Sequence, residues 1–167
     1  MELPGMLQTI AEVSIAFAGF SGLIVAFRKN AGPLTDVQKY RLQVLLSLAF
    51  GAMFLSLLPE LLTYFELPAA TVWTASSLVL AVYSGIFLFW WLAASQKVKR
   101  TSPELFNWIA FSRMAIGHVA VLIAVLTMAI RPQASLVAGV YISALIWYLL
   151  HAAQQFRRML FVQPRNQ

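Results

Sequence analysis

Polar residues interrupt the hydrophobic sequence at a few places, and the apolar segments between them are each long enough to cross a bilayer. The five segments cover residues 6–27, 42–65, 69–95, 105–130 and 134–156. A transmembrane helix needs about 20 mostly apolar residues, and lipid offers the backbone no hydrogen-bond partners, so each segment is expected to be helical. The pattern predicts an all-α, polytopic membrane protein with five transmembrane helices.

The connectors between these segments are short and carry turn or capping residues. The 131–133 connector predicts a hairpin of the fourth and fifth spans, and the 67–68 connector predicts one of the second and third. Thr35 is predicted to cap the helix of the second span, and Ser102 to cap that of the fourth, with Pro103 at its first position. Residues 1–167 are therefore predicted to form one transmembrane bundle domain.

Lysine and arginine concentrate in alternate polar segments. The first, third and C-terminal segments hold Arg28, Lys29, Lys39, Arg41, Lys97, Lys99, Arg100, Arg157, Arg158 and Arg165. The second and fourth connectors hold a single cation, Arg131. Positively charged connectors are retained on the cytoplasmic side of a membrane. We therefore predict an inner-membrane protein with its N-terminus outside and its C-terminus in the cytoplasm.

Composition narrows the function classes further. Hydrophobic residues make up 60% of the chain and charged residues 11%, which is unlike a soluble domain. The net charge of +6 lies beside the predicted spans, so its expected partner is the anionic headgroup region of the lipid bilayer and not nucleic acid. The absence of cysteine excludes a disulfide framework and a thiolate metal site.

The candidates for a pore or polar cavity all fall inside the predicted spans: Glu12, Glu60, Arg113 and His118. Charged side chains in the hydrocarbon zone need a partner or water. Glu12 and Glu60 fall at similar estimated depths, and two carboxyls that share a dry site would retain at least one proton. The alternatives are that Glu60 reaches the outer headgroups, that Arg113 extends to the inner surface, and that His118 bonds a backbone carbonyl or hydroxyl.

Small residues in the first and fourth spans are the candidates for close helix packing: Ser14, Ala18, Gly19, Gly22 and Gly117. Such residues let helix backbones approach each other in a membrane. The first helix carries small residues on one face and polar residues on another, so it is expected to lie at the centre of the bundle, surrounded by protein. Small-residue faces in several spans also favour a homo-oligomer.

The two histidines of the chain, His118 and His151, fall on adjacent predicted helices. A bis-histidine haem requires both imidazoles at one iron. At a rise of 1.5 Å per residue, the predicted spans place the two residues about 10 Å apart in depth. We therefore predict no haem, no other cofactor and no metal site.

The segment Gly19-Phe20-Ser21-Gly22 resembles the GxSG sequence around the nucleophile of rhomboid intramembrane proteases, over these four residues only. Those enzymes place the serine on a later helix of a bundle with at least six spans, whereas this match lies in the first of five. Glycine and serine are also the residues that close helix packing favours. Ser21 is therefore predicted to be a contact residue, and the chain is predicted not to be an enzyme.

These features favour an oligomeric, channel-like inner-membrane protein that conducts or senses small ions, with protonation of buried acids as its control. A noncatalytic accessory or scaffold subunit, which would bind a protein partner in a larger membrane complex, is the alternative. An intramembrane enzyme is the third.

Overall fold

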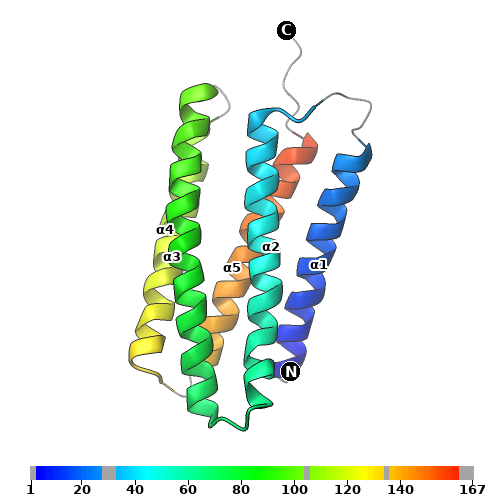
Figure 1. Cartoon of the computed structure of the whole chain (residues 1–167). Helices are drawn as coiled ribbons and strands as arrows, with labels where there is room; N and C mark the ends of the chain where they lie inside the picture. The colour runs from blue at the N-terminus through cyan, green and yellow to red at the C-terminus, as the bar shows by residue number, and fades with distance from the viewer. Residues whose placement is uncertain (1–2, 28–32, 104–105, 134–135, 162–167) are drawn as a thin grey trace.

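The computed structural model describes residues 3–27, 33–103, 106–133 and 136–161, which form a bundle of antiparallel helices (Figure 1). The helices are α1 (Leu3–Phe27), α2 (Asp36–Thr63), α3 (Ala69–Thr101), α4 (Trp108–Ile130) and α5 (Val137–Phe161). All five are long and apolar enough to cross a membrane. The all-α prediction is confirmed, and the five helices fit a multi-pass membrane protein.

The start of α2 agrees with its predicted cap. The backbone N–H of Gln38 donates to the hydroxyl of Thr35, and the Gln38 carboxamide oxygen accepts from the Thr35 N–H at 3.1 Å. This reciprocal capping box satisfies two amide groups that the first turn of a helix leaves without partners.

The start of α4 does not agree with its predicted cap. Asn107 caps α4, because its side chain accepts from the N–H of Ala110 at 2.9 Å. Ser102 instead ends α3. The predicted boundary at Ser95 is too early, because α3 continues through a charged last turn. Cations at that position are favoured by the helix dipole, and their alkyl stems can lie along an apolar bundle.

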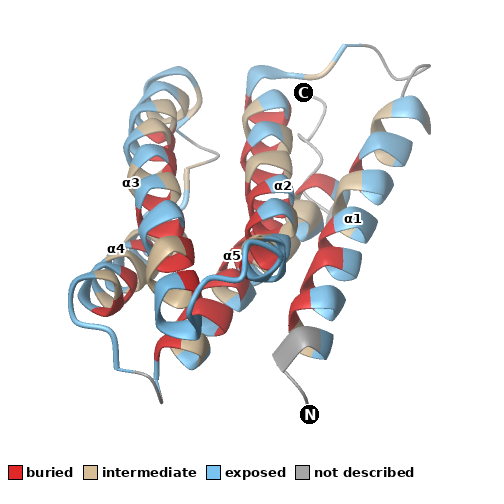
Figure 2. Cartoon of the chain, turned by 60° about the horizontal axis from the view of Figure 1, so that its bottom comes forward, coloured by how far each residue is buried: buried red, intermediate tan, exposed pale blue. Residues whose placement is uncertain are grey.

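The central helix is α5, which contacts all four other helices. Within the described residues, α1 touches α2 and α5 only, and α4 touches α3 and α5 only. Figure 2 shows the consequence for α1, whose buried residues form one stripe while the rest of its surface is exposed. The prediction that the first helix occupies the bundle centre is therefore wrong. Small residues permit close packing, but α5 carries the large side chains that fill the interior.

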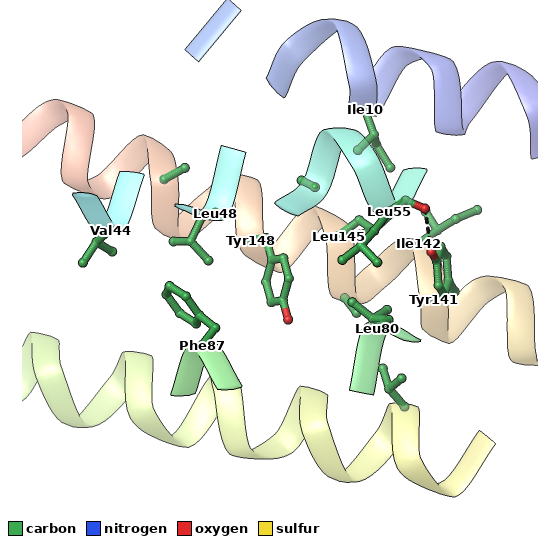
Figure 3. Close-up of a cluster of buried hydrophobic side chains, with 14 of the residues drawn as sticks. Ile10, Val44, Leu48, Leu55, Leu80, Phe87, Tyr141, Ile142, Leu145 and Tyr148 are labelled. Carbon is green, nitrogen blue, oxygen red and sulfur yellow. Dashed lines mark hydrogen bonds between the residues drawn. The ribbon is translucent and has the colours of Figure 1, made fainter. Parts of the chain in front are cut away.

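The core lies where α2, α3 and α5 meet. Leu48, Leu80 and Leu145 are fully buried there, together with Tyr148. In Figure 3 their side chains converge from the three helices, and the hydroxyl of Tyr141 donates to the backbone carbonyl of Leu55. Helix association in lipid depends on such van der Waals packing and interhelical hydrogen bonds, because the lipid chains are as apolar as the core.

The basic residues gather at one end of the bundle. Lys39 and Arg41 lie in the first turns of α2, Lys99 and Arg100 in the last turn of α3, and Arg158 in the last turn of α5. These turns lie at the same end, which is the upper end in Figure 1. We call it the basic end. The other end carries the short α2–α3 and α4–α5 connections.

Candidate functional site: a buried histidine pair and its polar connection

Polar residues recur along one face of α5. Tyr141, Tyr148, His151, Gln155 and Arg158 follow one another at spacings of seven, three, four and three residues, which places them on the same side of a helix. Since α5 is central, this face is enclosed, and His151, Tyr148 and Gln155 are at most 3% exposed. The central helix therefore carries a polar column that ends at the basic end.

The middle of this column meets α4 at the second histidine. Nε2 of His118 lies 2.8 Å from Nδ1 of His151, and both side chains are buried. The predicted separation in depth is therefore wrong. His118 lies ten residues after Trp108, where α4 begins, and His151 lies ten residues before Phe161, where α5 ends. Both are thus about 15 Å from the basic end, because α5 extends further than the predicted fifth span.

Gln155 continues the connection on the next turn of α5. Its Nε2 lies 2.9 Å from Nε2 of His151. A neutral pair allows two arrangements of hydrogens. In one, Gln155 donates to His151 and His151 donates to His118. In the other, His118 donates to His151, which donates to the Gln155 carboxamide oxygen after that group has turned over. The hydrogen-bonded chain can therefore run in either direction.

Aromatic rings enclose the two imidazoles. The ring centroid of Trp91 lies 5.7 Å from that of His118 and 5.5 Å from that of His151. Phe87 and Tyr148 lie 5.2 and 5.8 Å from His118. These rings keep water away from the imidazoles on several sides, so a hydrogen bond between them meets little competition from solvent.

Gly117 accounts for the close approach of α4 to α5 at this level. A Cβ atom at position 117 would overlap the indole ring of Trp147. The same ring lies against His118, with centroids 6.1 Å apart. Glycine at this position thus lets α4 come close enough for His118 to reach His151.

A small cavity connects the column with the basic end. Its volume is about 40 Å³, and its lining includes His151, Gln155, Trp91, Arg41 and Arg158. We call it the basic-end cavity. Its lining therefore extends from His151 to the two arginines at this end.

The facing nitrogens of the pair are closer than two imidazole nitrogens on one tetrahedral metal ion. Such nitrogens, each about 2.0–2.1 Å from the metal, are about 3.3 Å apart. The observed 2.8 Å between His118 and His151 is a hydrogen-bond distance. In the part of the chain that the structure describes, no three histidine, cysteine or acidic residues are grouped in a way that could hold a metal ion.

No protein-family model, curated protein or solved structure matches this chain. The interpretation of the site accordingly rests on its own geometry.

The remaining predicted cavity residues lie apart from the histidine pair. Glu12 is exposed on α1, where it accepts a hydrogen bond of 3.0 Å from Gln8. Glu60 is exposed near the opposite end of the bundle and lines a separate cavity of about 410 Å³. Arg113 is exposed on α4. Among the described residues, no hydrogen bond or ion pair joins any two of these three side chains. A single chain thus does not bring them together with His118.

The predicted packing residues of α1 fall on different sides of the helix. Ser14 is fully buried and donates to the carbonyl of Ile10, and Ala18 is half-buried. Gly19 and Gly22 are exposed, and a Cβ at either position would meet no neighbouring atom. These two glycines are open on the surface of the single chain.

The GxSG segment lacks the partner that a serine nucleophile needs. Ser21 is buried, and its hydroxyl donates to the carbonyl of Ala18 at 2.8 Å. Neither histidine is hydrogen-bonded to it in the described structure, and α1 does not touch α4, which carries His118. Ser21 is therefore a packing residue in this arrangement.

Tyr141, Tyr148, Gln155 and Arg158 were not among the predicted site residues, and His151 was considered only as a haem ligand. Their spacing with His151 was readable in the sequence as a polar face on an otherwise apolar helix. The role of Trp91 was not readable, because its contact with the pair depends on how α3 packs against α4 and α5.

Proposed function

We propose that this protein responds to protons in a membrane, and so senses or conducts small ions, with His118, His151 and Gln155 as the responsive group. The hydrogen bond of 2.8 Å between two buried imidazoles is the observation that carries the proposal. Histidine is the side chain whose ordinary protonation range lies closest to physiological pH. The role is not an enzymatic one.

The chemistry of the pair limits its uptake to one proton. A neutral pair has a single hydrogen between the facing nitrogens, and an added proton converts one ring to imidazolium while the N–H···N bond persists. A second proton would place hydrogens on both facing nitrogens, remove the acceptor and bring two positive charges together. The pair therefore has two stable states that differ by one charge.

The path by which protons reach the histidine pair supports proton sensing more than proton conduction through a single chain. The polar connection reaches His151 from the basic end through Gln155. On the other side of the pair, the hydroxyl of Tyr148 pairs with that of Ser84, and fully buried Leu80 and Leu145 follow. A proton that enters from the basic end thus meets an apolar core before the opposite end. This is the reason to place control at the histidines and not at the exposed acids.

A second observation favours a homo-oligomer as the conducting or signalling unit. Glu12 and Gln8 are exposed at membrane-spanning positions of α1, on the helix that also exposes Gly19 and Gly22. A carboxylate facing lipid costs a few kcal/mol, which a second copy or an intersubunit water path would remove. We also propose that the basic end faces the cytoplasm from an inner membrane, since positive connectors are retained on that side.

The experiment is proton, cation and anion flux in sealed liposomes, measured with separate dyes across a pH series. Wild-type protein is compared with His118→Gln, which keeps a polar side chain, and with Glu12→Gln. A pH-dependent flux that His118→Gln makes independent of pH supports the proposal. If the flux keeps its pH dependence in His118→Gln and loses it in Glu12→Gln, the acidic residues and not the histidines would be the pH-responsive groups. The absence of flux at any pH would rule out conduction by the isolated protein. Proton sensing would then be tested by an NMR titration of the two histidines.

A further inference from the structure

Two arginines meet at the basic-end cavity. Nη1 of Arg41, on α2, donates to the backbone carbonyl of Arg158, on α5, at 3.1 Å. Arg41 is only 7% exposed, and Arg158 is half-buried. Among the described residues, the single ion pair within 4.0 Å joins Lys39 to Asp36 and involves neither arginine. Two partly buried arginines that line one cavity favour a compensating negative charge beside them.

The wall of the same cavity holds buried polar atoms that lack partners. Trp91 and Gln155 are 2% and 3% exposed, and both line the cavity. The carboxamide Oε1 of Gln155 and the indole Nε1 of Trp91 have no hydrogen bond of ordinary geometry in the described structure, and the candidate partner beside Trp91 is the hydroxyl of Tyr40, which pairs with Ser95. Buried polar groups are nearly always hydrogen-bonded, and each exception calls for an explanation. The Trp91 N–H is a donor beside two arginines, which favours a ligand with several acceptor atoms, whereas Gln155 can face such a ligand only after its carboxamide has turned over.

We propose that the basic-end cavity binds one oxyanion of the phosphate class. The guanidinium groups of Arg41 and Arg158 supply planar, permanently charged donors suited to phosphate oxygens, and Trp91 supplies an N–H donor. Gln155 adds its NH₂ group when the carboxamide is turned toward the cavity. This proposal rests on observations other than the histidine hydrogen bond, although Gln155 belongs to both sites.

The size and position of the cavity fit such a group. Its volume of about 40 Å³ compares with the roughly 10–15 Å³ that one buried water needs, so it has room for about three or four oxygen atoms. It lies at the basic end, so a phosphate enters from the membrane surface. The phosphate belongs either to a lipid headgroup or to free inorganic phosphate, and the two sources share the same recognition chemistry.

The test uses the full-length protein, stripped of lipid in a neutral detergent. Inorganic phosphate is titrated by calorimetry, and phosphatidylglycerol and phosphatidylcholine are added separately and counted by native mass spectrometry. Arg41→Gln and Arg158→Gln are each expected to weaken binding about tenfold or more, since each removes a charge-assisted hydrogen bond. Trp91→Phe is expected to weaken it by a smaller factor. Arg157→Gln is the matched control, because Arg157 is the exposed neighbour of Arg158 and undergoes the same change in charge.

Two results support the proposal and identify the source. Saturable binding of one inorganic phosphate would identify free phosphate as the ligand of the cavity. Retention of one phosphatidylglycerol would identify the ligand as a lipid headgroup. Excess phosphate should then displace this lipid, and phosphatidylcholine should not replace it. Thermal melting of each variant separates lost binding from lost folding, and Arg158→Lys provides a variant that keeps the charge.

Three results would overturn it. One is the absence of saturable binding of either ligand to the wild type. Another is an equal loss in Arg157→Gln and Arg41→Gln, which would show a general surface charge effect. The third is saturable phosphate binding that neither Arg41→Gln nor Arg158→Gln weakens.

Discussion

The polar faces of α5 and α1 have opposite surroundings in the same bundle. On α5, His151 and Gln155 are neutral, buried and linked to His118. On α1, Gln8 and Glu12 also form a hydrogen bond one helical turn apart, but they are exposed. The difference lies in the place of each helix: α5 contacts every other helix, and α1 contacts two. Polar residues on a membrane-spanning helix thus indicate contact with protein or water, but not whether the contact lies within one chain.

The largest expected effect concerns the packing that brings the histidines together. Gly117→Ala should destabilise the fold by about 1–3 kcal/mol, because the added Cβ overlaps the Trp147 ring and forces α4 away from α5. Gly22→Ala is the matched control on α1, where nothing lies within 4 Å of the added atom, and should change stability by less than about 0.5 kcal/mol. Unfolding in mixed micelles measures both. Equal effects would contradict the assigned contact.

A double-mutant cycle compares the two hydrogen-bonded pairs directly. For His118→Phe and His151→Phe the coupling energy should be about 1 kcal/mol, because each single change leaves the other buried imidazole without its partner. For Gln8→Leu and Glu12→Leu it should be about 0.2–0.5 kcal/mol, the usual value for exposed pairs four residues apart. A larger coupling on α1 than on the α4–α5 pair would reverse the comparison.

Glu12→Leu is expected to have the smallest effect on the stability of the fold. The substitution should nevertheless change the oligomeric state of the protein. The substitution removes an exposed carboxylate and should leave the stability of the single chain nearly unaltered. If the α1 face contacts a second copy through Glu12, the mass of the detergent-solubilised particle should fall toward that of one chain. Analytical ultracentrifugation measures this, with Glu66→Leu, in the exposed α2–α3 connection, as the control. If the wild-type protein is already monomeric, the proposed interface between copies through α1 is contradicted.

Much of the fold was readable in the sequence, because span length and helix capping are local properties. The five helices and the capping box at Thr35 follow from the order of apolar and polar residues. The ends of α3 and α5 were not readable, because charged last turns such as that around Arg100 continue a helix beyond its apolar segment. That error in α5 is also what separated His118 from His151 in the predicted depths.

The candidate site was readable only in part. His118 stood out as a polar residue in an apolar span, and the spacing of His151, Gln155 and Arg158 was present in the sequence. The pairing of α4 with α5 at one depth depends on Gly117 fitting against Trp147, which is a property of the packed bundle. Glu12, Glu60 and Arg113 were selected by their charge alone, and charge does not reveal which helix face a neighbour covers.

The most direct test of the histidine pair is ¹⁵N NMR of the full-length protein labelled at histidine. The chain contains two histidines, so every imidazole signal belongs to the pair when the purification tag contains none. We predict that the nitrogens of His118 and His151 are hydrogen-bonded to each other, that the pair takes up one proton as a unit, and that His118→Gln alters the signals of His151. Two independent titrations at the ordinary pKa of exposed histidine, with His151 unchanged by His118→Gln, would contradict the account.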